Sequence, residues 1–225
     1  MKHLMYEDWT KKRVNKIKSI FGKDWFHHKK ILELGACHGD VGIEFLKLGA
    51  DVLFTDARES NLKLLYDKLN KINFNPKLKI VDQNKDYNLK TKYDLVFHLG
   101  VLYHIKNWKK DLENCLKHSN KLILESLVSP VKNLKSNTEN SFIYKYNSID
   151  GVESIFTQEA VENHLLKLKC KFIRLDTIDL NTDWSWMNEG KRVRKIYDWT
   201  YESMKSYVYD NNDSTQFRRM WIVLK

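Results

Sequence analysis

The sequence has few of the residues that mark linkers, repeats and disulfide-rich proteins. Its 225 residues include two prolines, eight glycines and three cysteines, and no two cysteines form a CxxC pair. The scarcity of proline and glycine excludes long flexible linkers, and the cysteines are too few for a disulfide framework or a cysteine zinc site. We therefore expect no metal and a single domain covering residues 1–225.

Long apolar runs are also missing. No stretch approaches the roughly 18 apolar residues that a membrane-crossing helix needs, and the start, Met1-Lys2-His3-Leu4, lacks the apolar region of a signal peptide. With 42% hydrophobic residues the chain can still bury one substantial core. These absences predict a soluble, cytoplasmic protein without a membrane partner.

Positive charge is abundant, and its composition qualifies what it means. The net charge is +10, which would suit binding to phosphate groups of a nucleic acid. Only seven of the 39 basic residues are arginines, so a solvated, lysine-rich surface accounts for most of the charge. A nucleic-acid partner is possible but not favoured, and the oligomeric state stays open.

The hydrophobic pattern alternates between short apolar runs and helical segments. Apolar spacing over residues 6–21 predicts an amphipathic helix that packs on the domain or covers its cofactor, with residues 1–22 as the N-terminal segment. Strands buried on both faces by crossover helices give near-continuous apolar runs of the kind that follows. The predicted strands are residues 31–34, 52–55, 78–81, 95–98 and 122–124, and the helices are residues 41–48, 60–71 and 108–117.

The C-terminal part continues the pattern with two interruptions. Thr157 is predicted to cap a helix that runs to about Lys169, followed by strands at residues 171–180 and 219–224. The last strand can pair antiparallel beside the sixth. We thus predict a Rossmann-like, doubly wound, mostly parallel seven-stranded sheet with helices on both faces. Residues 30–127 form its cofactor-binding core, and residues 128–156 and 181–216 are insertions that form a substrate lid.

The strongest motif is Glu33-Leu34-Gly35-Ala36-Cys37-His38-Gly39, at the end of the first strand. Glycine allows a tight turn from strand to helix and lets a ligand approach the backbone. The ExGxxxG pattern resembles that of class I S-adenosylmethionine (SAM)-dependent methyltransferases. The resemblance implies that the loop faces the methionine part of SAM and that Glu33 helps to position it. A dinucleotide-binding loop would carry glycine where Cys37 stands.

Acidic residues follow the second and third strands. Asp56 can accept hydrogen bonds from ribose hydroxyls, in SAM as in NAD; the alternative is an acid that stabilises the following helix. The next two residues, Ala57 and Arg58, are expected to bind the cofactor as well. In the resembling family, Asp82 and Gln83 would meet the adenine, whereas Asp82 taken alone is a turn residue.

The fourth strand leads into Leu99-Gly100-Val101-Leu102-Tyr103-His104. This run resembles small-molecule methyltransferases and, distantly, the tRNA wobble-uridine carboxymethyltransferases, and it implies that Leu99 and Gly100 lie beside the cofactor. His104 is the first candidate for a general base, because imidazole titrates near neutrality. Tyr103 could orient the acceptor, and Glu125 is a second candidate base or substrate anchor. Structural alternatives for His104 and Glu125 are a helix cap and a hydrogen bond.

The resemblance implies methyl transfer from SAM, with S-adenosylhomocysteine (SAH) as product, to a small-molecule or glycan-like acceptor. One alternative is an RNA-modifying enzyme acting on tRNA, since aromatic and basic residues are interleaved in residues 184–209; those aromatic residues also suit a packed lid. Another alternative is a SAM-binding partner protein without activity, and an NAD-dependent reductase fits least.

Overall fold

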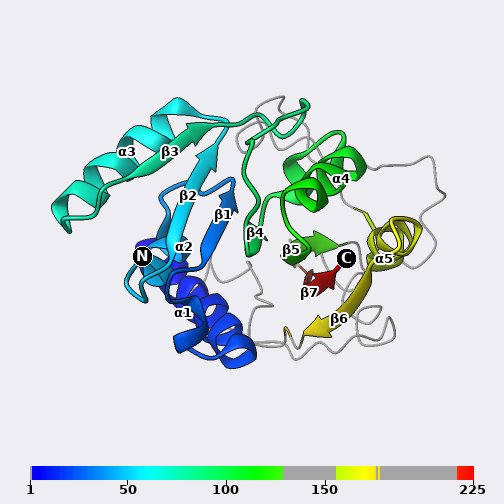
Figure 1. Ribbon diagram of the computed structural model, residues 1–225. Helices are drawn as coiled ribbons and strands as arrows, with labels where there is room; N and C mark the ends of the chain where they lie inside the picture. The colour runs from blue at the N-terminus through cyan, green and yellow to red at the C-terminus, as the bar shows by residue number, and fades with distance from the viewer. Residues whose placement is uncertain (1, 129–155, 176, 178–216) are drawn as a thin grey trace. The chain divides into compact units, whose positions relative to one another are not determined.

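The computed structural model describes residues 2–128, 156–175, 177 and 217–225 (Figure 1). Seven strands form one sheet in the order β3-β2-β1-β4-β5-β7-β6, flanked by helices. This is the predicted Rossmann-like architecture, mostly parallel with an antiparallel last strand. The proposed insertions 128–156 and 181–216, including the aromatic residues of 184–209, lie almost entirely outside the described residues.

The elements follow the predicted alternation. Along the first part of the chain they are α1 (Lys2–Phe21), the 3-10 helix η1 (Asp24–Phe26), β1 (Lys30–Leu34), α2 (Asp40–Leu46), β2 (Asp51–Asp56), α3 (Glu59–Lys71), β3 (Lys77–Ile80) and β4 (Leu95–Leu99). They continue with η2 (Leu102–His104), α4 (Trp108–His118), β5 (Lys121–Val128), α5 (Gln158–Lys167), β6 (Lys171–Leu175) and β7 (Phe217–Leu224).

Backbone contacts divide the chain into two compact units, which are described separately. Unit 1 comprises Met1–Leu99 and Lys109–Ile123, and unit 2 comprises Gly100–Trp108 and the described residues from Leu124 to Lys225. The expectation of a single domain stays a prediction. No helix in the described ranges is both long enough and apolar enough to cross a membrane, and the cellular location stays a prediction too.

In unit 1 the parallel strands bring their carboxyl ends to one edge. β1 pairs with β2 and β4, and β2 pairs with β3, all in parallel. Helix α3 packs on β2 and β3 through a stripe of buried leucines, Leu62, Leu65 and Leu69, which is the spacing of a helix with one apolar face. Helix α1 buries Trp9, Val14 and Ile17 and packs against α2. The N-terminal helix therefore packs on the domain, as predicted.

In unit 2 the last two strands pair antiparallel, with Lys171 opposite Leu224 and Leu175 opposite Met220. The predicted cap of α5 is confirmed, because the Thr157 hydroxyl accepts a hydrogen bond from the Ala160 N–H at 3.1 Å. Strand β6 ends at Leu175, and most of its predicted extension to residue 180 falls outside the described residues.

One strand is longer than predicted. The sequence prediction ended the fifth strand at Leu124, because Glu125 and Ser126 interrupt its apolar run, but β5 continues to Val128. Both polar residues are fully buried and bonded, Glu125 to an arginine and the Ser126 hydroxyl to the Leu127 carbonyl. A buried polar side chain with a hydrogen-bond partner is compatible with a core strand. The polarity of these two residues was therefore not a sign that the strand ends.

Candidate active site

The glycine loop between β1 and α2 has the backbone that its sequence predicts. Gly35, Cys37 and Gly39 all have positive φ, at 61°, 50° and 67°. The loop is tied to β2 by the Ala36 N–H, which donates to the Thr55 carbonyl at 2.8 Å, and closes on itself by a 2.7 Å bond from the Gly39 N–H to the Ala36 carbonyl. Three residues in the left-handed region therefore produce the turn, and two of them are glycines.

Glu33 lies under this loop, in contact with α2. The carboxylate accepts a hydrogen bond from the Gly42 N–H at 3.1 Å and is almost fully buried. Burial raises the pKa of Glu33 to about 8, although the Gly42 N–H lowers it. A Cβ on Gly42 would lie 2.2 Å from the Glu33 Oε2 atom. Gly42 is thus a site residue that sequence reasoning left without a role; its signal was a glycine inside a short helix.

Asp56 joins the glycine loop to the start of α3. Its Oδ2 atom accepts a hydrogen bond from the Cys37 N–H at 2.9 Å, and its Oδ1 atom accepts from the Arg58 N–H at 2.8 Å and from the Asn61 amide at 3.1 Å. Ala57 is a bend after β2, and Arg58 is the extended residue before α3. An ionised carboxylate offers about four acceptor positions, so three are used within the protein.

Asp82 and Gln83 follow β3 in the direction of the chain. Asp82 is a turn residue here: it accepts from the Asn84 N–H at 3.0 Å and pairs with Lys85 at 3.0 Å. Gln83 is different, because it is buried and its amide nitrogen has no hydrogen-bond partner within the described part of the chain. The Val81 N–H donates to the Asp56 carbonyl at 3.0 Å, which ties this turn to the end of β2.

His38 is exposed, and its carbonyl oxygen accepts a hydrogen bond from the Lys68 ammonium at 3.4 Å. Leu99 ends β4 and is partly exposed. The predicted cofactor residues of unit 1 thus share one edge of the sheet, where hydrogen bonds from the Cys37 and Val81 N–H groups to Asp56 link the loop after β1, the end of β2 and the turn after β3. This edge is the expected ligand position in an open α/β sheet.

In unit 2 the segment after β4 carries the predicted acceptor-side residues. Gly100 has φ 72° and its N–H donates to the Glu125 carbonyl at 2.9 Å. Tyr103 and His104 lie on η2, with ring centroids 4.1 Å apart. Tyr103 is buried and His104 is partly exposed. The structure therefore brings three of the predicted residues, Gly100, Tyr103 and His104, into one short turn.

Glu125 is bound to an arginine that sequence reasoning missed. Its Oε1 atom lies 2.7 Å from the Arg218 Nη1 atom, and both side chains are buried. The Arg218 guanidinium also lies beside Tyr103, with its central carbon 5.9 Å from the ring centre, and Tyr103 is one of the groups that raise the pKa of Arg218. Burial lowers the pKa of Arg218, but the Glu125 carboxylate and the neighbouring Tyr103 raise it by more, so the pKa lies above that of an unperturbed arginine. The only sequence signal was a pair of arginines in an apolar strand.

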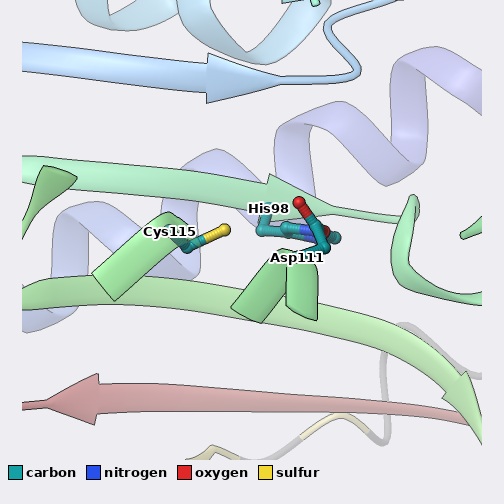
Figure 2. A group of neighbouring side chains, drawn as sticks. All are labelled: His98, Asp111 and Cys115. Carbon is teal, nitrogen blue, oxygen red and sulfur yellow. The ribbon is translucent and has the colours of Figure 1, made fainter. Parts of the chain in front are cut away.

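A second buried polar group lies between β4 and α4 in unit 1 (Figure 2). The His98 imidazole faces the Asp111 carboxylate, with Nε2 and Oδ2 2.7 Å apart. Asp111 also accepts a hydrogen bond from the Tyr87 hydroxyl at 3.3 Å. The same hydroxyl lies 3.5 Å from the Cys115 sulfur. Burial raises the pKa of Tyr87 and of Cys115, so both stay neutral at physiological pH.

His98, Asp111 and Cys115 have the chemistry of metal ligands and lie within 4.8 Å of one another. Two nitrogen or oxygen ligands of a tetrahedral zinc ion are about 3.3 Å apart. The 2.7 Å separation of His98 and Asp111 is shorter, and is that of a strong hydrogen bond. This arrangement ties β4 to α4.

Comparisons with known proteins identify the family of the chain. A family model described as lysine methyltransferase matches residues 5–149, which is more than half of the chain. No curated protein sequence matches the chain significantly.

Several solved structures share the fold at low sequence identity. The N-terminal domain of EvdMO1 with bound SAH is 15% identical, with 96% of this chain and 80% of that chain covered and a TM-score of 0.65. Magnesium protoporphyrin IX methyltransferase from Synechocystis with bound SAM is 13% identical, with 98% and 80% covered and a TM-score of 0.60. A SAM-dependent methyltransferase from Clostridium acetobutylicum is 16% identical, with 97% and 91% covered and a TM-score of 0.60. With the family match, the glycine loop and the strand-end acids, these likenesses lead to one conclusion: the chain belongs to the lysine methyltransferase family and is a SAM-dependent methyltransferase.

Proposed function

We propose that SAM lies along the carboxyl edge of β1, β2 and β3, and that its methyl group is transferred to a small-molecule or glycan-like acceptor. The observation that carries the cofactor part is the buried Gln83 amide, which has a donor to spare within the described residues. A buried donor without a partner is rare, and an adenine ring nitrogen is an acceptor of the kind it lacks.

The other unit 1 residues fit the rest of the cofactor. In this proposal the positive-φ loop from Gly35 to Gly39 lies against the methionine part, next to Glu33. Asp56 is the ribose ligand in this proposal. Because three of its acceptor positions are used by Cys37, Arg58 and Asn61, two ribose hydroxyls can bind only if one of these bonds opens. The Asn61 bond, at 3.1 Å, is the longest and comes from a side chain that can turn away.

SAM supplies a methyl group on a sulfonium, so the protein has mainly to align the acceptor and to remove its proton. We assign proton removal to His104 and acceptor alignment to Tyr103. Glu125 is less suited to act as a base, because a carboxylate held by a guanidinium is stabilised in its charged form. In this proposal it serves as an anchor within the protein.

A small acceptor is supported by the neighbours of the fold. EvdMO1 has a structure in the presence of SAH and D-fucose, at 14% identity and a TM-score of 0.65, and the Synechocystis enzyme is named for magnesium protoporphyrin IX. D-fucose and magnesium protoporphyrin IX are both small molecules. We extend this class of compound, and neither of the two compounds, to the acceptor of this chain.

A second candidate acceptor is a protein lysine, which the family model favours. The lysine ammonium must lose a proton before its nitrogen can attack the methyl group, and His104 would again be the base. RNA is a weaker candidate that rests on the net charge of +10; salt-sensitive binding of RNA to the purified protein would favour it.

The deciding experiment is incubation of the protein with methyl-labelled SAM and fractionated cell extract. We expect label in the small-metabolite or glycan fraction. Label confined to protein, recovered as methyl-lysine after hydrolysis, would replace our acceptor by a lysine, and label in RNA would replace it by a nucleotide. Calorimetry with SAM and SAH is the independent check: if neither binds the pure protein, the cofactor assignment fails.

A further inference from the structure

Two adjacent arginines of β7 have separate tasks. Successive side chains of a strand point to opposite faces, and Arg218 and Arg219 do so here. Arg219 donates from Nε to the Gln158 side chain of α5 at 3.1 Å, whereas Arg218 donates to Glu125 of β5 at 2.7 Å. Both arginines are buried, with 4% and 0% of their surface exposed. They are therefore matched in type, strand and burial, and differ in what they hold.

Stability alone does not explain the pair of Arg218 and Glu125. Removing two charges from water costs several kcal/mol per ion, and apolar residues of similar volume are often as stable or more so. The gain that remains is orientation, since a guanidinium presents its N–H donors in a fixed plane. Here one donor reaches a carboxylate within β5, and the guanidinium lies beside the Tyr103 ring on η2.

Strand β5 also holds the acceptor-side turn through its backbone. The Glu125 carbonyl accepts the Gly100 N–H at 2.9 Å, and the turn closes through the His104 N–H, which donates to the Val101 carbonyl at 2.8 Å. One residue of β5 thus fixes the start of the turn with its backbone, and through Arg218 fixes Tyr103 with its side chain. The Tyr103 ring in turn lies against His104.

We propose that Arg218 is a positioning residue for methyl transfer, which holds the Tyr103 hydroxyl in one orientation while Glu125 holds Arg218. This inference rests on the proposed function, in which Tyr103 aligns the acceptor. A phenol oxygen has one O–H and two lone pairs. A donor from Arg218 to one lone pair would therefore fix the direction of the phenol oxygen relative to η2. Arg218 acts through Tyr103 and touches no substrate.

The test compares Arg218→Lys with Arg219→Lys, each assayed for label transfer from SAM to the extract fraction that the wild-type protein labels. Lysine keeps the charge and loses the planar fork. We expect Arg218→Lys to lower the maximal labelling rate about 10- to 100-fold, the loss that a misplaced group causes, with little change in SAM affinity by calorimetry. Arg219→Lys is expected to keep the rate while losing thermal stability to a similar extent.

Tyr103→Phe supplies a second measurement that needs no change at Arg218. It should lower the maximal rate by a similar factor, and adding Arg218→Lys to it should lower the rate no further, because the two act as one unit. Wild-type rates in Tyr103→Phe, equal rates in the two lysine variants, or losses that multiply in the double variant would each overturn the proposal. If the wild-type protein labels no fraction, the proposed function falls and this inference with it.

Discussion

The two sets of candidate residues are built differently. In unit 1 the cofactor residues are held by short-range partners: Glu33 by Gly42, nine positions away, and Asp56 by residues two, five and nineteen positions away. In unit 2, Glu125 is held by Arg218, 93 positions away. The cofactor edge is therefore a local property of one stretch of chain, whereas the acceptor-side turn depends on the last strand. Substitutions in the two regions should separate cofactor affinity from turnover.

The largest expected effect is on turnover, from His104→Ala. Loss of a general base typically lowers the rate about 100- to 10,000-fold, and SAM affinity should stay close to that of the wild type, because His104 belongs to the acceptor side. Rates of label transfer and calorimetry measure the two quantities. The exposed His27 is a suitable control for loss of an imidazole. Unchanged turnover would remove His104 from the chemistry.

Asp56→Ala should give the opposite pattern, a loss of affinity. Removing a charged hydrogen-bond acceptor costs roughly 1.5 to 3 kcal/mol of binding free energy. The dissociation constant for SAM should therefore rise about 10- to 150-fold. Asp67, exposed on the following helix α3, provides the matched control for loss of one negative charge. Undiminished affinity in Asp56→Ala would refute the ribose assignment and weaken the contrast between the two regions.

Gly42→Ala tests how tightly the cofactor region is packed. Its new methyl group would lie 2.2 Å from the Glu33 carboxylate and 2.4 Å from the Phe54 ring. Overpacking of this kind costs about 1 to 3 kcal/mol of unfolding free energy, to be measured by urea titration. Ser60→Ala on the exposed start of α3 is the control. A variant as stable as the wild type would mean that Glu33 can move aside freely.

Glu33 should also give the stability of the fold a dependence on pH. Its pKa of about 8 lies above the value of 4.5 for an unperturbed glutamate, so between these values the folded protein keeps a proton that the unfolded chain has lost. Stability should therefore fall as pH rises from about 4.5 to 8, by at most about 1.4 kcal/mol per pH unit. Glu33→Gln has no such proton and should flatten this slope in urea titrations of the protein without SAM. An unchanged slope would mean that the Glu33 side chain is solvated.

The contrast between partners that are close in sequence and partners that are far apart also explains what the sequence could predict. Motifs such as Glu33 to Gly39, the Thr157 cap and the alternation of strands and helices depend on neighbouring residues, so pattern and spacing were sufficient. The role of Arg218 depends on a residue of β5, and the extent of β5 depends on Arg218, so neither could be derived alone. The bond between His98 and Asp111 was missed for the same reason, since it needs the packing of α4 on β4.

The backbone of the glycine loop qualifies the use of its fingerprint. Cys37 stands where a dinucleotide-binding loop carries glycine, yet it already has a φ of 50° and donates its N–H to Asp56. A glycine at this position would therefore change the volume beside the loop and leave its path as it is. At residue 37, the choice between glycine and cysteine therefore alters the side chain and leaves the turn unchanged.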